Sequence, residues 1–272
     1  MPRRVVAGHS IEIVELGEGQ PVVFLHGNGT DHRATLHSLD PVVARRTGYR
    51  RLHLDLPGYG ASPGNEAIHG SDGMLAVVLD LLDALTGDEP VILVGSSWGA
   101  YLARGVVARR RAQVKAVAML VPAIEADRAR RDLDPFQQLV PAFAPLDGGT
   151  PELRAEFLEG AVIAGPSQWR HFRDAVAPAV AAADPATLDR IEAAYPFTED
   201  VDSVGPPFAG PSLIVVGRQD DVVGYRDALR LVERYPRSTF AILDVAGHLI
   251  WADRPGVVAA LLDDWLERVE GA

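Results

Sequence analysis

Residues 90–99 read PVILVGSSWG, an apolar run that ends in a Gly-x-Ser-x-Gly pattern. The run predicts a buried strand, and the apolar side chains of residues 100–111 recur at helical spacing. A Ser on a sharp strand-to-helix turn needs glycine two residues to either side, because larger side chains there would collide with the strand and the helix. This pattern predicts Ser97, rather than Ser96, as a nucleophile. The alternative is a glycine-rich turn that only packs tightly.

Outward from this stretch, short runs of Val, Ile and Leu alternate with segments of helical spacing. The predicted strands are residues 21–26, 51–56, 90–95, 114–121, 212–217 and 239–245, with 11–16 as an edge strand. The predicted helices are residues 73–85, 100–111, 225–235 and 255–269. This alternation is typical of an α/β protein with a mostly parallel sheet and helices on both faces.

The alternation stops between residues 122 and 210, where Ala-rich and Leu-bearing segments are broken by Pro and Gly. It resumes at Ser212. We therefore predict one core, residues 1–121 and 211–272, interrupted by a helical cap at 122–210.

The amino-acid composition excludes several classes of function. The 272 residues are 47% hydrophobic and 23% charged, which is typical of a globular protein, and the net charge of −11 repels nucleic acid and anionic membranes. The absence of Cys removes disulfides and Cys nucleophiles and fits a reducing compartment. No signal peptide is visible behind the basic start Met1-Pro2-Arg3-Arg4, and no apolar stretch is long enough to cross a membrane. We expect a cytoplasmic protein.

A serine nucleophile needs a base and a carboxylate. His248 follows the run at 239–245, and Asp220 follows the run at 212–217. Loops after parallel strands meet at one edge of the sheet, so both side chains are predicted near Ser97. An imidazole takes and returns the serine proton, and the carboxylate holds its other nitrogen. Taken singly, a lone His is more often structural and a loop Asp more often forms a turn.

The developing oxyanion needs two donors. We predict the backbone N–H groups of Trp98 and of Asn28, which lies in the glycine-rich stretch His26-Gly27-Asn28-Gly29. A phosphate cradle is the alternative for this stretch, but it lacks GxGxxG and the P-loop Lys and Ser/Thr. The eight His are scattered without an HExxH pattern, so no metal and no cofactor are expected. His26 and Trp251 are predicted to bind substrate. Phe136, Trp169 and Phe172 either line an apolar pocket with Trp251 or pack within the protein.

Together these motifs resemble the α/β-hydrolase superfamily. The resemblance rests on HG at 26–27, DLPGYGAS at 55–62, GSSWG at 95–99, GRQD at 217–220 and GH at 247–248. It implies a catalytic triad in the order Ser97, Asp220, His248, a structural role for residues 55–62, and a substrate-shaping cap at 122–210. Ser97 departs from haloalkane dehalogenases and epoxide hydrolases, which carry Asp there. GSSWG is similar to proline iminopeptidases, but Gly27-Asn28-Gly29-Thr30 departs from their Gly-Gly-Pro-Gly turn.

The sequence therefore predicts a cofactor-free serine hydrolase of a small or medium, largely apolar ester or other acyl compound. A carbon-carbon bond hydrolase of a vinylogous diketone is the alternative, because the resemblance implies the same triad for it. A ligand-binding module on a retained hydrolase fold is a further alternative. The expected partner is a small-molecule substrate. The sequence does not decide between a monomer and a homo-oligomer.

Overall fold

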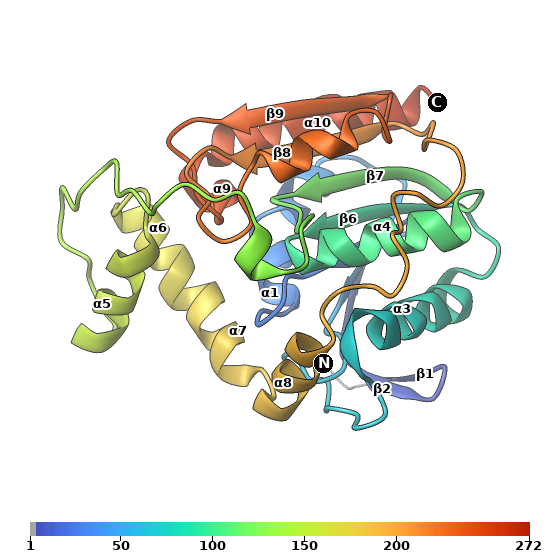
Figure 1. Cartoon of the computed structure of the whole chain (residues 1–272), viewed down its shortest axis with the longest axis horizontal. Helices are drawn as coiled ribbons and strands as arrows, with labels where there is room; N and C mark the ends of the chain where they lie inside the picture. The colour runs from blue at the N-terminus through green and yellow to red at the C-terminus, as the bar shows by residue number, and fades with distance from the viewer. Residues whose placement is uncertain (1–3) are drawn as a thin grey trace.

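A seven-stranded sheet forms the centre of the protein in a computed structural model that describes residues 4–272 (Figure 1). The strand order is β3-β5-β4-β6-β7-β8-β9, and all neighbours are parallel except β3 and β5. The bounds are Ile13–Leu16 (β3), Gln20–Leu25 (β4), Tyr49–Leu54 (β5), Val91–Ser96 (β6), Val114–Leu120 (β7), Ser212–Gly217 (β8) and Ser238–Leu243 (β9). The predicted fold class is confirmed. Met1–Arg3, part of the basic start, lies outside the described residues.

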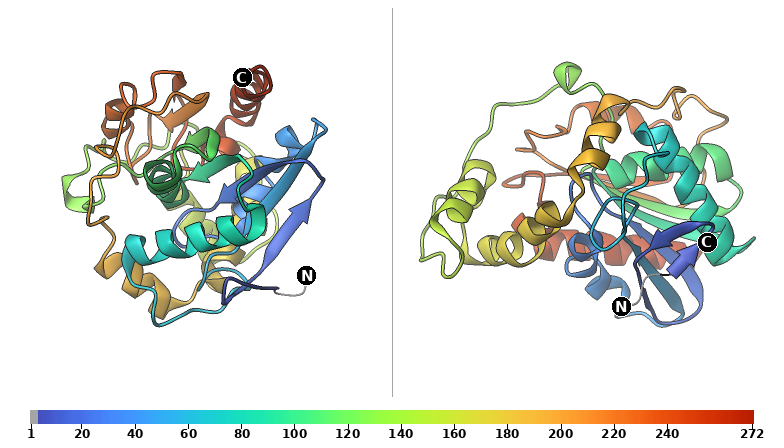
Figure 2. Two further views of the ribbon diagram at one scale, coloured as in Figure 1. Left: turned by 90° about the vertical axis from the view of Figure 1, so that its right-hand side faces the viewer. Right: turned by 90° about the horizontal axis from the view of Figure 1, so that it is seen from below.

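Helices cover both faces of this sheet (Figure 2). One face carries α3 (Gly70–Thr86) and α4 (Trp98–Arg110), and the other carries α1 (His32–Leu36), α2 (Asp40–Val43) and α10 (Pro255–Glu270). Every residue of β6 and of β8 is buried, which explains their continuous apolar runs. Along the described chain no helix is both long enough and apolar enough to span a membrane.

The remaining core elements are small. They are β1 (Arg4–Val6) and β2 (His9–Ile11), which form an antiparallel ribbon, the 3-10 helix η3 (Asp227–Leu231) and α9 (Ile250–Asp253). The α-helix predicted at 225–235 is wrong. Its apolar spacing is real, because Ala228, Leu231 and Tyr235 are buried, but the N–H groups of Leu229 and Val232 bond three residues back, as in a 3-10 helix.

Residues 122–210, which we call the cap segment, contain helices and loops. These are η1 (Arg128–Arg130), α5 (Pro151–Gly160), α6 (Pro166–His171), the π-helix η2 (Phe172–Val176), α7 (Ala177–Ala182) and α8 (Pro185–Ala193). Thr150 and Asp184 cap α5 and α8 with their side chains, and Pro follows at the first helical position of each. Helices α5 to α8 lie beside the carboxyl ends of the parallel strands (Figure 1).

Both ends of the cap segment attach to α4 through one arginine. Arg104 is fully buried, and its guanidinium donates 2.7 Å to the backbone oxygen of Ala123 and 3.0 Å to a carboxylate oxygen of Asp202. The Ala123 N–H in turn donates to the backbone oxygen of Ser97 over 3.2 Å. The entry and the exit of the cap segment are therefore fixed to the helix that follows Ser97.

Candidate active site

Ser97 occupies a strained turn between β6 and α4. Its φ of 53° lies in the left-handed region, which residues other than glycine rarely adopt. A Cβ at Gly95 would lie 2.6 Å from the backbone oxygen of Gly99, and one at Gly99 would lie 2.1 Å from that of Leu25. The steric argument for the Gly-x-Ser-x-Gly pattern therefore holds. Ser97 lines a cavity that His248 also lines, whereas Ser96 is buried in the strand.

The structure brings Ser97, His248 and Asp220 together from three distant parts of the chain. The Oγ of Ser97 lies 3.0 Å from Nε2 of His248, and Nδ1 of His248 lies 2.9 Å from Oδ2 of Asp220. The other oxygen of Asp220 accepts the N–H groups of Val222 and Val223 over 2.9 and 3.0 Å. The buried Asp220 carboxylate is thus held on both oxygens, which fixes the direction in which it meets the imidazole.

Sequence reasoning missed two residues that hold the His248 loop. Gln219 accepts the N–H of Ala246 over 3.0 Å and donates its backbone N–H to the oxygen of Ala246, so it joins the loops after β8 and β9. Asp253 accepts the N–H of Gly247 over 2.9 Å, and burial raises the pKa of Asp253 to about 6. The only sequence signal for either was its closeness to Asp220 or His248.

The predicted oxyanion donors lie beside Ser97. A Cβ built on Gly27 would stand 3.2 Å from the Cβ of Ser97, so the loop carrying Asn28 passes next to the serine. Within residues 4–272 no protein atom accepts a hydrogen bond from the backbone N–H of Asn28 or of Trp98. Both groups are therefore available to a ligand oxygen near Ser97.

The side chain of Asn28 links the core to the cap segment. Its Oδ1 accepts the hydroxyl of Tyr59, which lies in the 55–62 loop, and its Nδ2 donates 2.7 Å to Oε1 of Glu192 on α8. The amide is therefore clamped from two sides, and one of the clamps comes from the cap segment. Sequence analysis gave no sign of Glu192.

Two predicted substrate-binding residues do not line the cavity beside Ser97, which is a correction. His26 is fully buried, with Nδ1 2.9 Å from the backbone oxygen of Gly27 and Nε2 accepting the N–H of Leu56, and its burial lowers the pKa. Trp251 is buried and donates its indole N–H to Nε2 of His171 over 3.0 Å. Both rings are used in packing and hydrogen bonds within the protein.

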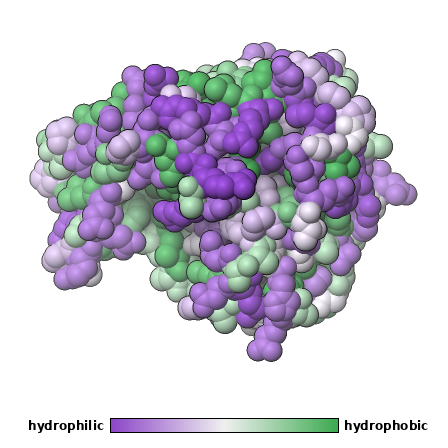
Figure 3. All heavy atoms as spheres, viewed as in Figure 1, coloured by the Kyte–Doolittle hydropathy of each residue, from purple (hydrophilic) through white to green (hydrophobic). Residues whose placement is uncertain are grey.

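A cavity of about 510 Å³ lies over Ser97 and His248. Four of its lining side chains carry formal charge, and all four belong to the cap segment: Asp127, Arg128, Arg131 and Glu192. Polar side chains also gather at the middle of the face in Figure 3, over the stretch of chain that carries η1. The space next to Ser97 is therefore polar, whereas the sequence analysis predicted a largely apolar substrate.

A second chamber of about 270 Å³ shares His248 and Val222 with the first. Phe157, Val162 and Phe172 supply its apolar wall, so the predicted pocket role fits Phe172. Trp169 instead packs in the interior of the cap segment and is only 1% exposed. His248 thus stands between a polar and an apolar chamber.

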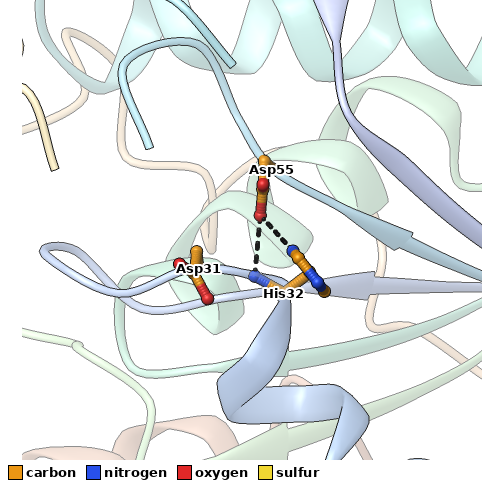
Figure 4. A group of neighbouring side chains, drawn as sticks. All are labelled: Asp31, His32 and Asp55. Atoms are coloured by element: carbon orange, nitrogen blue, oxygen red, sulfur yellow. Dashed lines mark hydrogen bonds and ion pairs between the residues drawn. The ribbon is translucent and has the colours of Figure 1, made fainter. Parts of the chain in front are cut away.

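One cluster of the described residues has the donor types of a metal site, namely Asp31, His32 and Asp55 (Figure 4). Oδ1 of Asp55 accepts both Nδ1 and the backbone N–H of His32, and Oδ2 accepts the N–H of Ala61. Arg33 pairs with Asp31. Because internal partners use these atoms, the cluster fits a brace between the loops after β4 and β5 better than a metal centre.

The fold and the site define a class: an α/β protein with a serine on its strand-to-helix turn and a His and an Asp behind it. The model of the alpha/beta hydrolase family matches residues 22–261, so the chain belongs to that family.

Several known proteins are similar to this chain. The crystal structure of an alpha/beta superfamily hydrolase from Oenococcus oeni PSU-1 superposes with a TM-score of 0.91 at 27% identity, covering 99% of this chain and 100% of that one. A 2-hydroxy-6-oxo-6-(2'-aminophenyl)hexa-2,4-dienoic acid hydrolase from Metapseudomonas resinovorans is 27% identical over 131 residues, 47% of this chain and 44% of its own. The lysophosphatidylserine lipase ABHD12 of Gallus gallus is 35% identical over 35% of this chain and 25% of its own. The chain matches less than half the length of these two relatives.

Proposed function

We propose that the protein is a serine hydrolase that cleaves a small or medium ester, or another acyl compound, through an acyl-enzyme. The observation that carries the proposal is the unbroken hydrogen-bond chain from Ser97 through His248 to Asp220 at the mouth of a cavity. A hydroxyl is a weak nucleophile at neutral pH, and an imidazole in contact with it removes that obstacle.

In the first half of the reaction, Nε2 of His248 takes the proton of Ser97 as Oγ attacks the substrate carbonyl carbon. Asp220 holds Nδ1–H and stabilises the imidazolium that forms. The carbonyl oxygen becomes an oxyanion and accepts the N–H groups of Asn28 and Trp98. The intermediate collapses, the bond to the leaving group breaks, and His248 returns the proton to that group.

In the second half, water replaces the leaving group. His248 takes a proton from the water as its oxygen attacks the acyl carbon, and the same two N–H groups receive the second oxyanion. Collapse breaks the bond to Ser97, which recovers its proton from His248. The acid product leaves, and the site returns to its starting state without a cofactor.

A carbon-carbon bond hydrolase of a vinylogous diketone is the second candidate. Its support is the Metapseudomonas relative, whose name describes hydrolysis of a dienoic acid. The two chambers that meet at His248 would separate the halves of such a substrate. The leaving group would then be a carbanion that His248 protonates at carbon, whereas an ester releases an alcohol.

The test is a Ser97→Ala variant with a fluorophosphonate probe. The wild type should be labelled at Ser97 and the variant should not, and turnover should fall about 10⁴-fold or more. Labelling that persists, or that moves to Ser96, contradicts the nucleophile assignment. The neighbouring Ser96→Ala variant is the matched control and should stay labelled.

A substrate panel separates the candidates. We expect p-nitrophenyl esters of increasing chain length to be hydrolysed faster than a dienone carbon-carbon substrate. The reverse order favours the second candidate. Tight binding of a ligand without turnover of any substrate would favour a binding module on the hydrolase fold.

A further inference from the structure

Arg131 is a positively charged residue of the cavity beside Ser97. Its half-buried guanidinium donates 2.9 Å to the backbone oxygen of Glu125, 2.9 Å to that of Val222 and 3.5 Å to that of Ala126. Within residues 4–272, neither Arg131 nor Arg128 pairs with an acid, whereas the buried Arg104 pairs with Asp202. Two positive and two negative side chains therefore line the cavity, and neither of its arginines is held in an ion pair by its acids.

The guanidinium of Arg131 has at least one donor that no group of the described chain uses. An arginine carries five N–H groups; the three carbonyls use three of them and the Tyr195 hydroxyl interacts with the guanidinium as well, which leaves at least one N–H on a terminal nitrogen. The Cζ atom of Arg131 lies 5.9 Å from the centre of the Tyr195 ring. Tyr195 also lines the cavity, so its ring restricts the orientation of the guanidinium. A free N–H on this cation can donate a charge-assisted hydrogen bond to a carboxylate oxygen.

We propose that Arg131, assisted by Arg128, forms a carboxylate-binding subsite, so that the preferred substrate is an acyl compound that carries a free carboxylate. The proposal rests on the proposed function and adds the substrate's charge to it. Arg128 is exposed, lines the same cavity and makes no ion pair among the described residues, so it adds positive charge at the mouth.

Two acids face the same cavity and are already occupied. Glu192 accepts the amide of Asn28, and Asp127 accepts the N–H of Ala129 as the cap of η1. They reduce the attraction for an anion but do not touch the guanidinium of Arg131. Removing the charge of Glu192 should therefore increase the preference for an anionic substrate, opposite to removing the charge of Arg131.

The experiment compares substrates that differ only in one charge. Mono-4-nitrophenyl adipate and its methyl ester place the carboxylate on the acyl side, and 4-acetoxybenzoate and its methyl ester place it on the leaving group. We expect kcat/KM to favour the anionic member of at least one pair by about ten- to a hundredfold, as one charge-assisted contact supplies. Added salt should reduce this ratio.

Variants then show which residue causes the preference, measured as the ratio of kcat/KM for the anionic substrate to kcat/KM for its methyl ester. Arg131→Gln should bring the ratio near one, Arg131→Lys should keep only part of it because the ammonium lacks the planar guanidinium, and Arg128→Gln should lower it by a few-fold. Arg130→Gln is the matched control, because Arg130 is adjacent, exposed and paired with Glu125, and does not line the cavity. Equal loss on both members of a pair would assign Arg131 a structural role and overturn the subsite.

Binding measured without turnover keeps the two proposals apart. In Ser97→Ala, the anionic member of the favoured pair should bind at least tenfold tighter than its methyl ester, and Arg131→Gln in that background should remove the difference. Equal binding of both members overturns the subsite. Failure of the fluorophosphonate to label Ser97, with charge-selective binding intact, overturns the serine hydrolase and leaves the subsite supported.

Discussion

The core and the cap segment differ in how tightly they are built. In the core, whole strands such as β6 and β8 are buried, and a single added Cβ at Gly99 would collide with the backbone. The cap segment has only one small cluster of its own, Phe157, Ala161, Ala164 and Trp169, and other buried cap residues such as Ile191 and Tyr195 pack into the core cluster instead. Close packing holds atoms to positions that loosely packed segments do not maintain.

The core and the cap segment contribute different residues to the site. Ser97, Asp220 and His248 all come from loops at the ends of core strands, where reacting atoms must keep distances near 3 Å. The charged side chains around the cavity come from the cap segment. We therefore propose that the core carries the chemistry and that the cap segment selects the substrate.

The sharpest test of the core compares two adjacent acids. Asp220→Asn should lower kcat about 10⁴-fold, because an amide holds the imidazole in the wrong tautomer. Asp221→Asn should change kcat little, because Asp221 lines the apolar chamber and makes no contact with the ring nitrogens of His248. Steady-state kinetics on the best ester measures both.

A large loss of kcat in Asp221→Asn and a small one in Asp220→Asn would identify Asp221 as the carboxylate behind His248. A small effect of both variants would mean that the hydrogen bond to Asp220 does not orient the base. Circular dichroism of Asp220→Asn must match the wild type, since the two N–H bonds that Asp220 accepts also shape its loop.

The sequence predicted the core well because its signals are local. Each buried strand carries its own apolar run, and the glycines at 95 and 99 mark the turn at Ser97 without reference to other segments. The same holds for the order of Ser97, Asp220 and His248, which the resemblance supplied. Their closeness in space follows from the parallel sheet.

The cavity could not be predicted in this way. Arg131 and Glu192 lie in surface-like segments with ordinary polar neighbours, and only folding brings them to Ser97. His26 misled the prediction because its place in a motif says nothing about whether its ring faces inward. The alternation of strand and helix likewise predicted an α-helix at 225–235, where the structure has the short 3-10 helix η3.

A weaker effect should appear where the cap segment touches the core. Glu192→Ala removes one clamp on Asn28, so the predicted oxyanion N–H loses part of its restraint. We expect kcat to fall about tenfold with little change in KM, less than the 10²- to 10³-fold for losing such a donor. Glu192→Gln keeps an oxygen for Asn28 and should retain kcat.

Glu199→Ala serves as the control for this link, because Glu199 is a cap-segment acid that pairs with Arg109 away from the cavity. Equal loss in the Ala and Gln variants would assign the effect to the charge of Glu192. No loss in either would mean that Tyr59 alone holds Asn28.

The smallest expected effect concerns stability at the loop that carries His248. Burial raises the pKa of Asp253 from 3.8 to about 6, so the folded protein binds more protons than the unfolded chain between these values. The free energy of unfolding therefore falls as pH rises through this window, and the full cost is present above pH 6. An amide keeps an oxygen for the Gly247 N–H without the charge.

Asp253→Asn should accordingly raise the free energy of unfolding by on the order of 1–3 kcal/mol at pH 7.5 and by almost nothing at pH 3.5, measured by urea denaturation at each pH. His171, whose pKa burial lowers to about 4, titrates in an overlapping range, but it is present in both proteins and cancels in the difference. Asp244→Asn, at an exposed acid on the same loop whose pKa the amide of Gln219 lowers, should not stabilise at pH 7.5. A gain at pH 7.5 that persists unchanged at pH 3.5 would show that the amide packs better, and that the buried charge is not the cause.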